Sequence, residues 1–374
     1  MKIEQVDIRL YRVPLPEPLE DSVHGIHTHF ELVICDIHAG EGMVGVGYTY
    51  TGGFGGAAIC QMLKTDLVPF LIGKDPDGIF HLWNALNWRV HYVGKGGLAS
   101  FAIAALDIAL WDIRGKKCGL PLWKLAGGTG RTARAYGGGI DLNYPVDRLL
   151  ENVKGYLDTG LRAVKIKVGK ERLDEDLDRV AAVRKFIGKD IDFMIDANMK
   201  WTVETAIRAT RRLEEFNLLW LEEPTIPDDL EGYAEIARRG ALSIAAGENY
   251  HTVMEFKNMF SYGKLDFPQP DVSNIGGITA WLKVADLCFA HNLPVCCHGM
   301  QELHVSLMAA MPHAGYLEVH SFPIDRYTTR PLVIDKDGRA VAPDVPGAGV
   351  EFRHDLLAPY RVTDIPECAR NSAF

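Results

Sequence analysis

The sequence predicts an α/β fold in which an α+β region precedes a (β/α)7-8 barrel of the TIM type. The chain has 374 residues and 47% apolar side chains, enough for a barrel of about 250 residues and a second domain. From about residue 133, apolar runs alternate with helical stretches, as in parallel α/β architectures. These runs end in polar residues that follow one another at steps of 29, 26, 26, 23, 27 and 20 residues. Each step has room for one strand, one helix and the loops that join them.

The N-terminal region, up to about residue 95, mixes short strands and helices as α+β domains do. Its Gly-rich tract at 52–56 lacks both the GxxxxGK[ST] pattern and the strand-GxGxxG-helix context. A mobile loop or lid is therefore a better interpretation of this tract than a phosphate-binding loop. The expected elements are strands that include 31–39 and 43–50, and helices at about 57–69, 78–90 and 98–116.

The barrel is predicted to occupy residues 131–321, after an N-terminal domain of residues 1–130. The last stretch, 322–374, has proline turns and charged loops, and we expect it to fold back on the N-terminal domain. The expected barrel strands are 133–139, 162–168, 193–198, 218–224, 242–248, 265–271, 293–298 and 316–318.

The composition excludes several classes of protein. The net charge is −9 and there is no dense Lys/Arg stripe, so we expect no nucleic-acid partner. No apolar run reaches the roughly 18 uncharged residues that a membrane-spanning helix needs, and the N-terminus does not have the pattern of an export signal. The seven cysteines are scattered without a CxxC pair. We therefore expect a cytoplasmic protein that does not bind membranes.

Three carboxylates end three consecutive strands of the expected barrel: Asp196, Glu222 and Glu248. Neighbouring strands are about 4.8 Å apart, so these anions must crowd together. A hard divalent cation with oxygen ligands resolves the repulsion, and Mg²⁺ fits better than zinc. The alternative is that each carboxylate pairs with a lysine or caps the next helix, but the occurrence of three in register favours a metal site.

Two lysines lie on the strand before the expected metal strands. Strict alternation over 162–168 places Lys165 and Lys167 on one face, which we expect to point into the barrel mouth. Close to each other and to a cation, either lysine should lose its proton more easily than a free lysine. A neutral Lys167 would be a base at physiological pH, unless both lysines only neutralise the carboxylates.

An acid-base pair is expected at the ends of strands six and seven. Asp271 would fix the tautomer of His298 and raise its basicity, leaving the other ring nitrogen free to transfer a proton. A buried core histidine is the alternative. Cys296 lies on the same strand face as His298, but nothing in the sequence suggests an oxyanion hole for a cysteine nucleophile. Glu318, after strand eight, could donate or share a proton with a substrate carboxylate.

Together these groups suit one chemical task, the removal of a proton from the carbon next to a carboxylate. A substrate held on the metal would have Lys167 on one side and His298 on the other. The cation would stabilise the enediolate that forms, and the general acid on the far side would decide how the enediolate reacts further.

The motifs that carry these residues resemble those of the enolase superfamily, in its mandelate racemase-like subgroup, over nearly the whole chain. They comprise Lys165-Ile-Lys167, Asp196-Ala-Asn198, Glu222 in Trp220-Leu-Glu-Glu-Pro224, Glu248 in Gly247-Glu-Asn249, Asp271, His298 and Glu318. The segment at 107–128 resembles the capping region of the superfamily.

The resemblance implies one Mg²⁺ per active site, a homo-oligomer, and a capping domain formed by both termini. Cap loops near 22–29 and 47–56 would select the substrate. The expected substrate-binding or supporting residues are His24, His27, His29, Tyr50, Asn198 and Glu302.

The resemblance also limits the reaction to three kinds: racemisation of 2-hydroxy acids, dehydration of acid sugars, and opening of cyclic sugar acids. Dehydration is the commonest use of this constellation in the family and is the first prediction, with Lys167 taking the α-proton and protonated His298 assisting departure of the β-oxygen. Three segments look more like cycloisomerases acting on 3,6-anhydro-galactonate or related lactones, which is the alternative: YTYTGG (48–53), HYVGKGG (91–97) and HSFPID (320–325). A non-catalytic sugar-acid binder is a third interpretation, but it would not need both Lys167 and His298.

Overall fold

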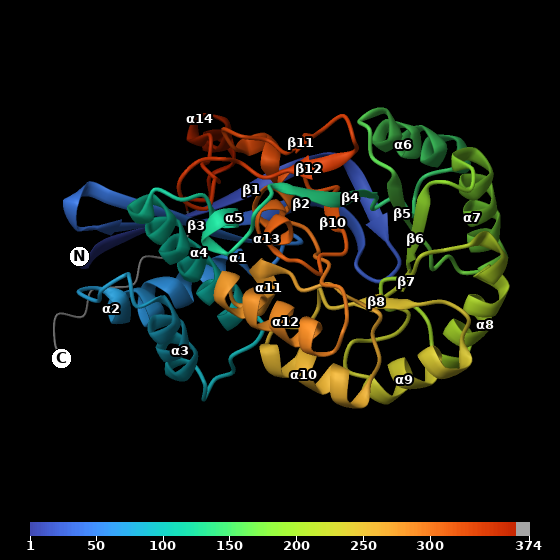
Figure 1. The fold of residues 1–374 in the computed structure, drawn as a ribbon, viewed down its shortest axis with the longest axis horizontal. Helices are drawn as coiled ribbons and strands as arrows, with labels where there is room; N and C mark the ends of the chain where they lie inside the picture. Colours follow the sequence, from blue (N-terminus) through green and yellow to red (C-terminus); the bar gives the residue numbers. More distant parts are fainter. Residues whose placement is uncertain (364–374) are drawn as a thin grey trace.

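The computed structural model describes residues 1–363 and shows an N-terminal α+β region beside a barrel (Figure 1). The N-terminal sheet is antiparallel, in the order β1-β2-β3. Its strands are longer than the short strands expected from the sequence, so β1 and β2 form an extended hairpin whose tip lies at residues 21–25. The strands are β1 (Ile3–Asp21), β2 (Gly25–Ala39) and β3 (Met43–Thr51).

Helices cover one face of this sheet, and the longest, α4 (Leu98–Cys118), lies directly on β3. Gly45 and Gly47 explain the close approach, because a Cβ on either would lie 2.3 or 1.9 Å from a backbone oxygen of α4. The predicted helix at 57–69 is divided by a π-helical turn, η2 (Leu63–Leu67). The other helices of this region are α1 (Gly56–Met62), α2 (Val68–Leu71), α3 (Ile79–Arg89) and α5 (Leu122–Leu125).

The barrel has the predicted parallel order, β4-β5-β6-β7-β8-β9, and β10 pairs with β4 to close the ring. The apolar runs were predicted well, but several form strands of only two or three residues. The strands are β4 (Thr132–Gly138), β5 (Ala163–Lys167), β6 (Asp192–Asp196), β7 (Leu221–Glu222), β8 (Ile244–Ala246), β9 (Phe267–Pro268) and β10 (Leu317–His320).

A ring of helices surrounds these strands (Figure 1). From β4 to β9, each strand is followed by at least one helix before the next barrel segment, as a parallel barrel requires. The helices are α6 (Val146–Asp158), α7 (Leu173–Ile187), α8 (Val203–Leu213), α9 (Leu230–Arg239), α10 (Val253–Tyr262), α11 (Val272–Ile275), α12 (Ile278–Ala290) and α13 (Gln301–Ala310).

The seventh predicted strand, 293–298, is not a regular strand, so this prediction was wrong in detail. Val295 forms an isolated bridge with Ala314. The next two residues donate to opposite sides, Cys296 N to the carbonyl of Pro268 at 2.8 Å and Cys297 N to that of Tyr316 at 3.3 Å. The segment therefore joins β9 to β10 and completes the barrel without a continuous ladder.

The C-terminal segment returns to the N-terminal region as predicted: Val362 N donates to Leu10 O at 2.9 Å. It also contributes two strands that were not predicted, and one of them, β12, pairs antiparallel with β4 of the barrel. The predicted segment extends to residue 374, but residues 364–374 lie outside the described part. The elements here are β11 (Val333–Ile334), β12 (Arg339–Val341) and α14 (His354–Leu357).

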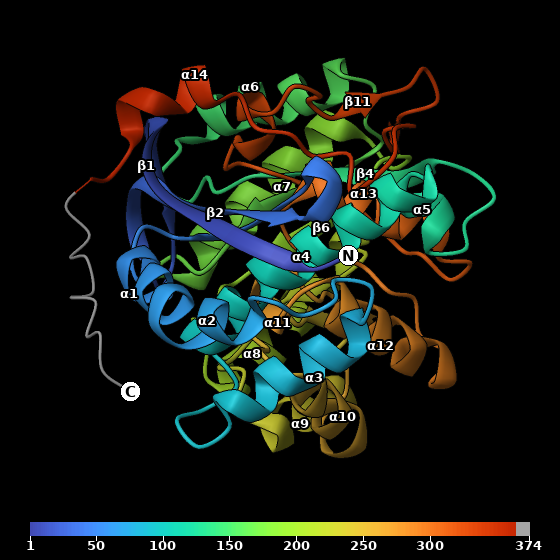
Figure 2. The same ribbon diagram turned by 90° about the vertical axis from the view of Figure 1, so that its left-hand side faces the viewer.

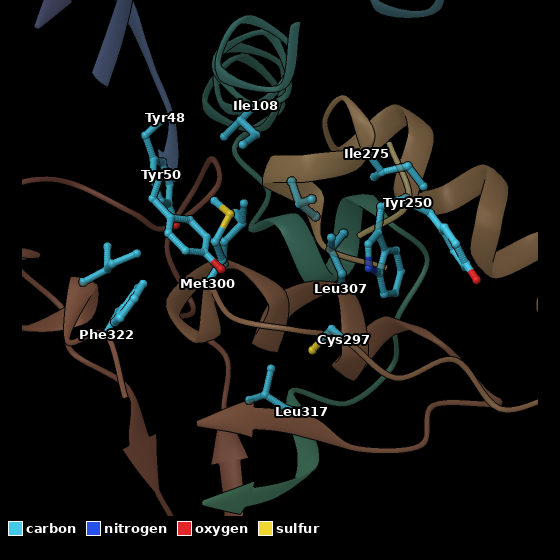
Figure 3. Close-up of a cluster of buried hydrophobic side chains, with 14 of the residues drawn as sticks. Tyr48, Tyr50, Ile108, Tyr250, Ile275, Cys297, Met300, Leu307, Leu317 and Phe322 are labelled. Carbon is cyan, nitrogen blue, oxygen red and sulfur yellow. The ribbon is translucent and has the colours of Figure 1, made fainter. Parts of the chain in front are cut away.

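One hydrophobic cluster runs from the sheet through α4 into the barrel wall. In Figure 3, Tyr50 of β3 extends toward Met300 below Ile108 of α4, and Leu317 lies further down on a barrel strand. Figure 2 shows the same relationship from the side, with the sheet in front of the barrel elements. The two regions are thus joined by a continuous apolar interface. Within residues 1–363, no helix is both long and apolar enough to cross a membrane.

Candidate active site

A cavity of about 470 Å³ lies where the tip of the β1–β2 hairpin meets the carboxyl ends of the barrel strands. Its barrel side includes Lys167, Glu248 and His298, and its cap side includes His24, residues 26–29 and 50–52, and Phe54. Ser22 holds the hairpin tip on the barrel, because its hydroxyl donates to the carbonyl of Ala197 at 2.7 Å.

The three predicted metal ligands converge beside this cavity. One oxygen each of Asp196, Glu222 and Glu248 lies within 4.8 Å of the other two. Asp196 and Glu222 are opposite one another in the β6–β7 register. Burial, together with the nearby carboxylates, raises the pKa of Glu222 to about 8 despite Lys165. The anions are therefore under strong mutual repulsion.

The donor set fits a hard divalent cation. Oε2 of Glu248 and Oδ1 of Asn198 are buried and accept no hydrogen bond within residues 1–363, although Glu248 Oε2 lies 3.6 Å from His298 Nε2 in an ion pair. Unpaired buried oxygen atoms are costly unless an ion or water satisfies them. Three carboxylates with further oxygen donors match the ligands that Mg²⁺ prefers.

The two predicted lysines differ in position. Lys165 Nζ is enclosed between Glu318 Oε1 at 2.9 Å, Glu222 and Asp196, and does not line the cavity. Lys167 does line it, with its Nζ 2.5 Å from Asp196 Oδ2. Among the pair, only Lys167 is placed to reach a substrate.

The proton affinity of the lysines is opposite to the sequence-based expectation. Burial alone would lower the pKa of Lys167, but the carboxylates of Asp196, Glu248 and Glu222 outweigh it and raise this pKa above its usual value. We expected the lysine pKa to fall because the other lysine and a bound cation would both repel the proton. Without a cation, the attraction of the carboxylates for the proton is the larger effect. A divalent charge held by these same carboxylates would cancel much of their attraction for the lysine proton.

Asp271 and His298 form the predicted dyad. Nδ1 of His298 is 2.9 Å from Asp271 Oδ2, which also accepts the hydroxyl of Tyr50 at 2.9 Å. Tyr50 can approach because Gly299, at φ +57°, has no Cβ; one would lie 2.4 Å from the Tyr50 hydroxyl. Burial opposes protonation of His298, but Glu248, Asp271 and Glu318 raise its pKa to about 10. In the protein without a metal ion these carboxylates favour the imidazolium form of the ring, and Asp271 would stabilise that form in an acid role.

Glu318 lies deep in the barrel, between the lysines and the dyad. Its Oε2 accepts the backbone N–H of Gly299 at 3.1 Å and is 3.9 Å from His298 Nε2. Although burial alone would raise the pKa of Glu318, Lys165 and His298 hold it below its usual value. The glutamate is thus ionised, which argues against the expectation that it donates a proton.

Four of the expected cap residues line the cavity. His24 Nδ1 and His27 Nε2 lie 3.1 and 2.8 Å from the same oxygen of Asp21. His29 Nε2 lies 3.3 Å from the carbonyl of Gly53, beside the Gly-rich tract, and Tyr50 bonds to the dyad. Asn198 also lines the cavity, at the edge of the metal site.

Glu302 is the exception among the expected substrate-binding residues. It is buried at the start of α13, where it accepts the hydroxyl of Tyr48, and it is not among the residues that line the cavity. It borders a different cavity, beside Arg131. Direct substrate contact by Glu302 is therefore not supported.

Several residues that line the cavity were not predicted from the sequence. Asp21 precedes the two cap histidines by three and six residues, a spacing that offered a signal. His320 follows Glu318 by two residues in β10, so alternation places both on one face of the strand. Phe322, His251 and Asn274 also line the cavity, and they have no pattern that could have identified them.

Two family models match the chain. Residues 5–127 match the N-terminal domain of mandelate racemase and muconate lactonizing enzyme, and residues 148–356 match the enolase C-terminal domain-like family.

Two characterised proteins illustrate the range of relatives. A 3,6-anhydro-alpha-L-galactonate cycloisomerase of Streptomyces coelicolor is 48% identical over 95% of this chain and 98% of that protein. An L-talarate/galactarate dehydratase of Salmonella typhimurium is 37% identical over 85% of this chain and 81% of that protein. The relatives thus include both predicted reaction types, dehydration and cycloisomerisation.

Two solved structures are similar to this chain over nearly its whole length. A racemase from Streptomyces coelicolor with bound magnesium has a TM-score of 0.94 and 47% identity, covering 96% of this chain and all of that one. The Salmonella dehydratase, liganded with Mg and L-lyxarohydroxamate, has a TM-score of 0.92 and 34% identity over 97% and 93% of the two chains. The predicted family is confirmed: the chain belongs to the enolase superfamily, in its mandelate racemase-like subgroup.

Proposed function

We propose that this protein is a Mg²⁺-dependent enzyme that removes the proton α to the carboxylate of a sugar acid and then expels the β-oxygen. One observation carries the proposal. Lys167 and His298 line one cavity from β5 and from the segment after Val295, with Glu248 of the carboxylate triad in the same wall. A base and an acid that face one substrate from two barrel segments suit an elimination.

The carboxylate triad would hold the cation and, through it, one end of the substrate carboxylate. When bound, Mg²⁺ supplies positive charge that stabilises the negative charge growing on that carboxylate as the α-proton leaves. Lys167 Nζ takes the proton, and Lys165 stays enclosed as a fixed cation beside Glu318. Glu318 holds the Lys165 ammonium through Oε1 and accepts the backbone N–H of Gly299 through Oε2, which keeps this carboxylate fixed between the lysines and the dyad.

The dyad supplies the acid. His298 Nε2–H delivers its proton to the β-oxygen as the Cβ–O bond breaks, and Asp271 stabilises the imidazolium through Nδ1–H. The hydroxyl of Tyr50, donating to the same Asp271 oxygen, fixes the orientation of the carboxylate.

The first proposed outcome is dehydration, in which the β-oxygen leaves as water and a 2-keto-3-deoxy acid results. The second is cycloisomerisation, in which the same oxygen belongs to a ring and stays tethered as a hydroxyl. The 48% identity to a cycloisomerase, over nearly the full length of both proteins, favours this second candidate. Both outcomes use the same residues in the same steps.

The charges of the cavity favour a substrate with a single carboxylate. Within residues 1–363, Lys167 is the only lysine or arginine that lines the cavity. The apolar residues Ile26, Phe54 and Phe101 also line the cavity and offer no partner to a second anion. An aldonate or anhydro-aldonate is therefore a better candidate than an aldarate diacid.

A substrate screen tests the function. D-galactonate, galactarate and 3,6-anhydro-α-L-galactonate are incubated with the protein and Mg²⁺, and the products are identified by mass spectrometry. A loss of water identifies a dehydratase, and an unchanged mass identifies a cycloisomerase or a racemase. Absence of turnover and of deuterium exchange at the α-carbon, with every acid, would contradict the proposal.

Three wider predictions remain proposals. A division into residues 1–130, 131–321 and 322–374 is supported by the two family models, which stop at residue 127 and start at residue 148. A cytoplasmic location is supported by the six cysteines of the described part, none of which is in a disulfide. A homo-oligomer is tested by light scattering of the purified protein.

A further inference from the structure

His320 is an ionisable side chain in the cavity to which the proposed mechanism gives no role. It is the last residue of β10, and it lines the cavity. Its ring centroid is 5.0 Å from that of His298 on one side and 4.8 Å from that of Phe322 on the other. It therefore lies directly beside the proposed acid.

The backbone fixes the position of the proton on His320. The N–H of Phe322 donates to Nδ1 of His320 at 3.1 Å, and a backbone N–H can only donate. Nδ1 must therefore present its lone pair, so the ring proton of neutral His320 is on Nε2. Within residues 1–363 this is the only hydrogen bond that His320 makes, which leaves Nε2–H free for a ligand.

His320 is also held neutral. Burial, with help from the positive charges of His298 and Lys167, lowers the pKa of His320 to about 3, although Glu318 opposes this shift. Beside the proposed acid, His320 therefore has an N–H that it can offer in a hydrogen bond but cannot give up at physiological pH.

The position of His320 indicates which part of the substrate it meets. One of its nitrogens lies within 4.8 Å of a nitrogen of His298 and of a carboxylate oxygen of Glu318. Its ring contacts are with His298, Tyr50 and Phe322, which form the acid side of the cavity. His298 Nε2 itself lies 3.6 Å from Oε2 of Glu248, so the proposed acid is flanked by His320 and by one residue of the carboxylate triad.

We propose that His320 donates a hydrogen bond from Nε2–H to the β-oxygen that leaves, and so holds this oxygen against His298. This inference rests on the proposed function. As the Cβ–O bond breaks, its electron pair goes to the oxygen, and the proton on Nε2 of His298 bonds to that oxygen. His320 keeps its own proton and stabilises the charge that develops there. The role is the same whether the oxygen leaves as water or stays tethered.

The test measures the partition between α-proton exchange and elimination. Wild type, His320→Leu, His320→Gln and His320→Asn are assayed in D₂O with Mg²⁺ and 3,6-anhydro-α-L-galactonate, or D-galactonate if only that acid reacts. His320→Leu should slow elimination about 10²-fold, the usual effect of losing one donor to a developing oxyanion. Exchange by Lys167 should continue, so deuterium accumulates in the recovered acid. The matched control is His81→Gln, at an exposed histidine outside the cavity.

The two amide variants separate a donor role from a packing role. The amide of glutamine reaches the position of Nε2, whereas that of asparagine reaches the position of Nδ1. His320→Gln should therefore restore elimination better than His320→Asn. An unchanged partition in His320→Leu, or an equal loss of exchange and elimination in all three variants, would overturn the proposal.

A second readout needs neither substrate nor metal. ¹⁵N NMR of the histidine rings, with His320→Gln to assign the signal, should show His320 as the neutral Nε2–H tautomer from pH 6 to pH 8. An Nδ1–H tautomer, or titration within this range, would also overturn the inference. If wild type neither exchanges nor converts any acid, the proposed function fails and this inference with it. If wild type is active and His320→Leu partitions like it, only the inference fails.

Discussion

The two walls of the cavity are built in different ways. On the barrel wall, Lys167 ends β5 and is paired with Asp196 of β6, so its position follows from the register of hydrogen-bonded parallel strands. On the cap wall, His24 and His27 lie at the tip of a long hairpin and are held by one carboxylate, Asp21. A barrel can thus keep the reacting groups in fixed positions while the residues at a hairpin tip change. We infer that the barrel wall determines the chemical step and the cap wall determines which acid is accepted.

The largest effect is expected at the metal site, on the barrel side of this comparison. Removal of Mg²⁺ with a chelator should abolish turnover, and Glu248→Gln should weaken Mg²⁺ binding by more than about 10²-fold, because the variant loses an anionic ligand. Isothermal titration calorimetry of the metal-free protein measures the affinity. Glu204→Gln, an exposed substitution on α8, is the control. Unchanged affinity in Glu248→Gln would exclude this residue as a ligand.

A smaller effect is expected where the two walls meet, at Tyr50. Tyr50→Phe removes the hydroxyl that donates to Asp271 Oδ2 and leaves the ring in place. The loss of one hydrogen bond to a charged group costs about 1.5 kcal/mol, so kcat should fall about 10-fold with little change in KM. If KM rises instead and kcat is kept, Tyr50 belongs with the substrate-selecting residues of the cap.

The cap histidines should affect selection more than catalysis. His27→Ala should raise KM several-fold at nearly constant kcat, because binding is weakened equally before and during reaction. We would measure kcat and KM of this variant with two acids, the best substrate and the next best. A fall in kcat comparable to that of Tyr50→Phe would remove the distinction between the two walls.

Substitution of Glu302 should have the smallest effect on activity, since the residue lies outside the cavity. Its clearest effect should be on the stability of the fold. Burial raises the pKa of Glu302 to about 8, despite the hydroxyl of Tyr48. Its neutral form stabilises the fold fully below the pKa of the unfolded chain, and this contribution is lost as pH rises through about 8.

Thermal unfolding between pH 5 and pH 8 tests this prediction. Wild type should lose stability relative to Glu302→Gln as the pH rises, by about 3 kcal/mol at most. The glutamine imitates the neutral acid at every pH. Parallel stability profiles of the two proteins would show that Glu302 does not titrate in this range.

The sequence predicted the strand-end charged groups of the barrel, because strand-end positions recur at a spacing that the barrel itself imposes. Lys167, Asp196 and Glu248 were found in this way, but His251, Asn274 and His320 were missed. The spacing does not say how long a strand is, so the short β7 and the irregular segment at Val295 could be known only from the structure.

The cap wall was predicted less well, for a physical reason. A hairpin tip has no required residue type and no repeat, so Asp21 was overlooked beside the histidines that it holds. His320 could have been found, because it shares a strand face with Glu318. Glu302 was predicted as a substrate-binding or supporting residue, and its place outside the cavity leaves only the supporting role.

Deuterium exchange at the α-carbon tests the division of labour between Lys167 and His298 most directly. With the substrate identified in the screen, Mg²⁺ and D₂O, His298→Asn should exchange the α-proton without elimination. Lys167→Ala should do neither, while both variants keep the circular dichroism spectrum of wild type and Lys189→Ala, an exposed control, stays active. Exchange or full activity in Lys167→Ala, or elimination at the wild-type rate in His298→Asn, would contradict the account.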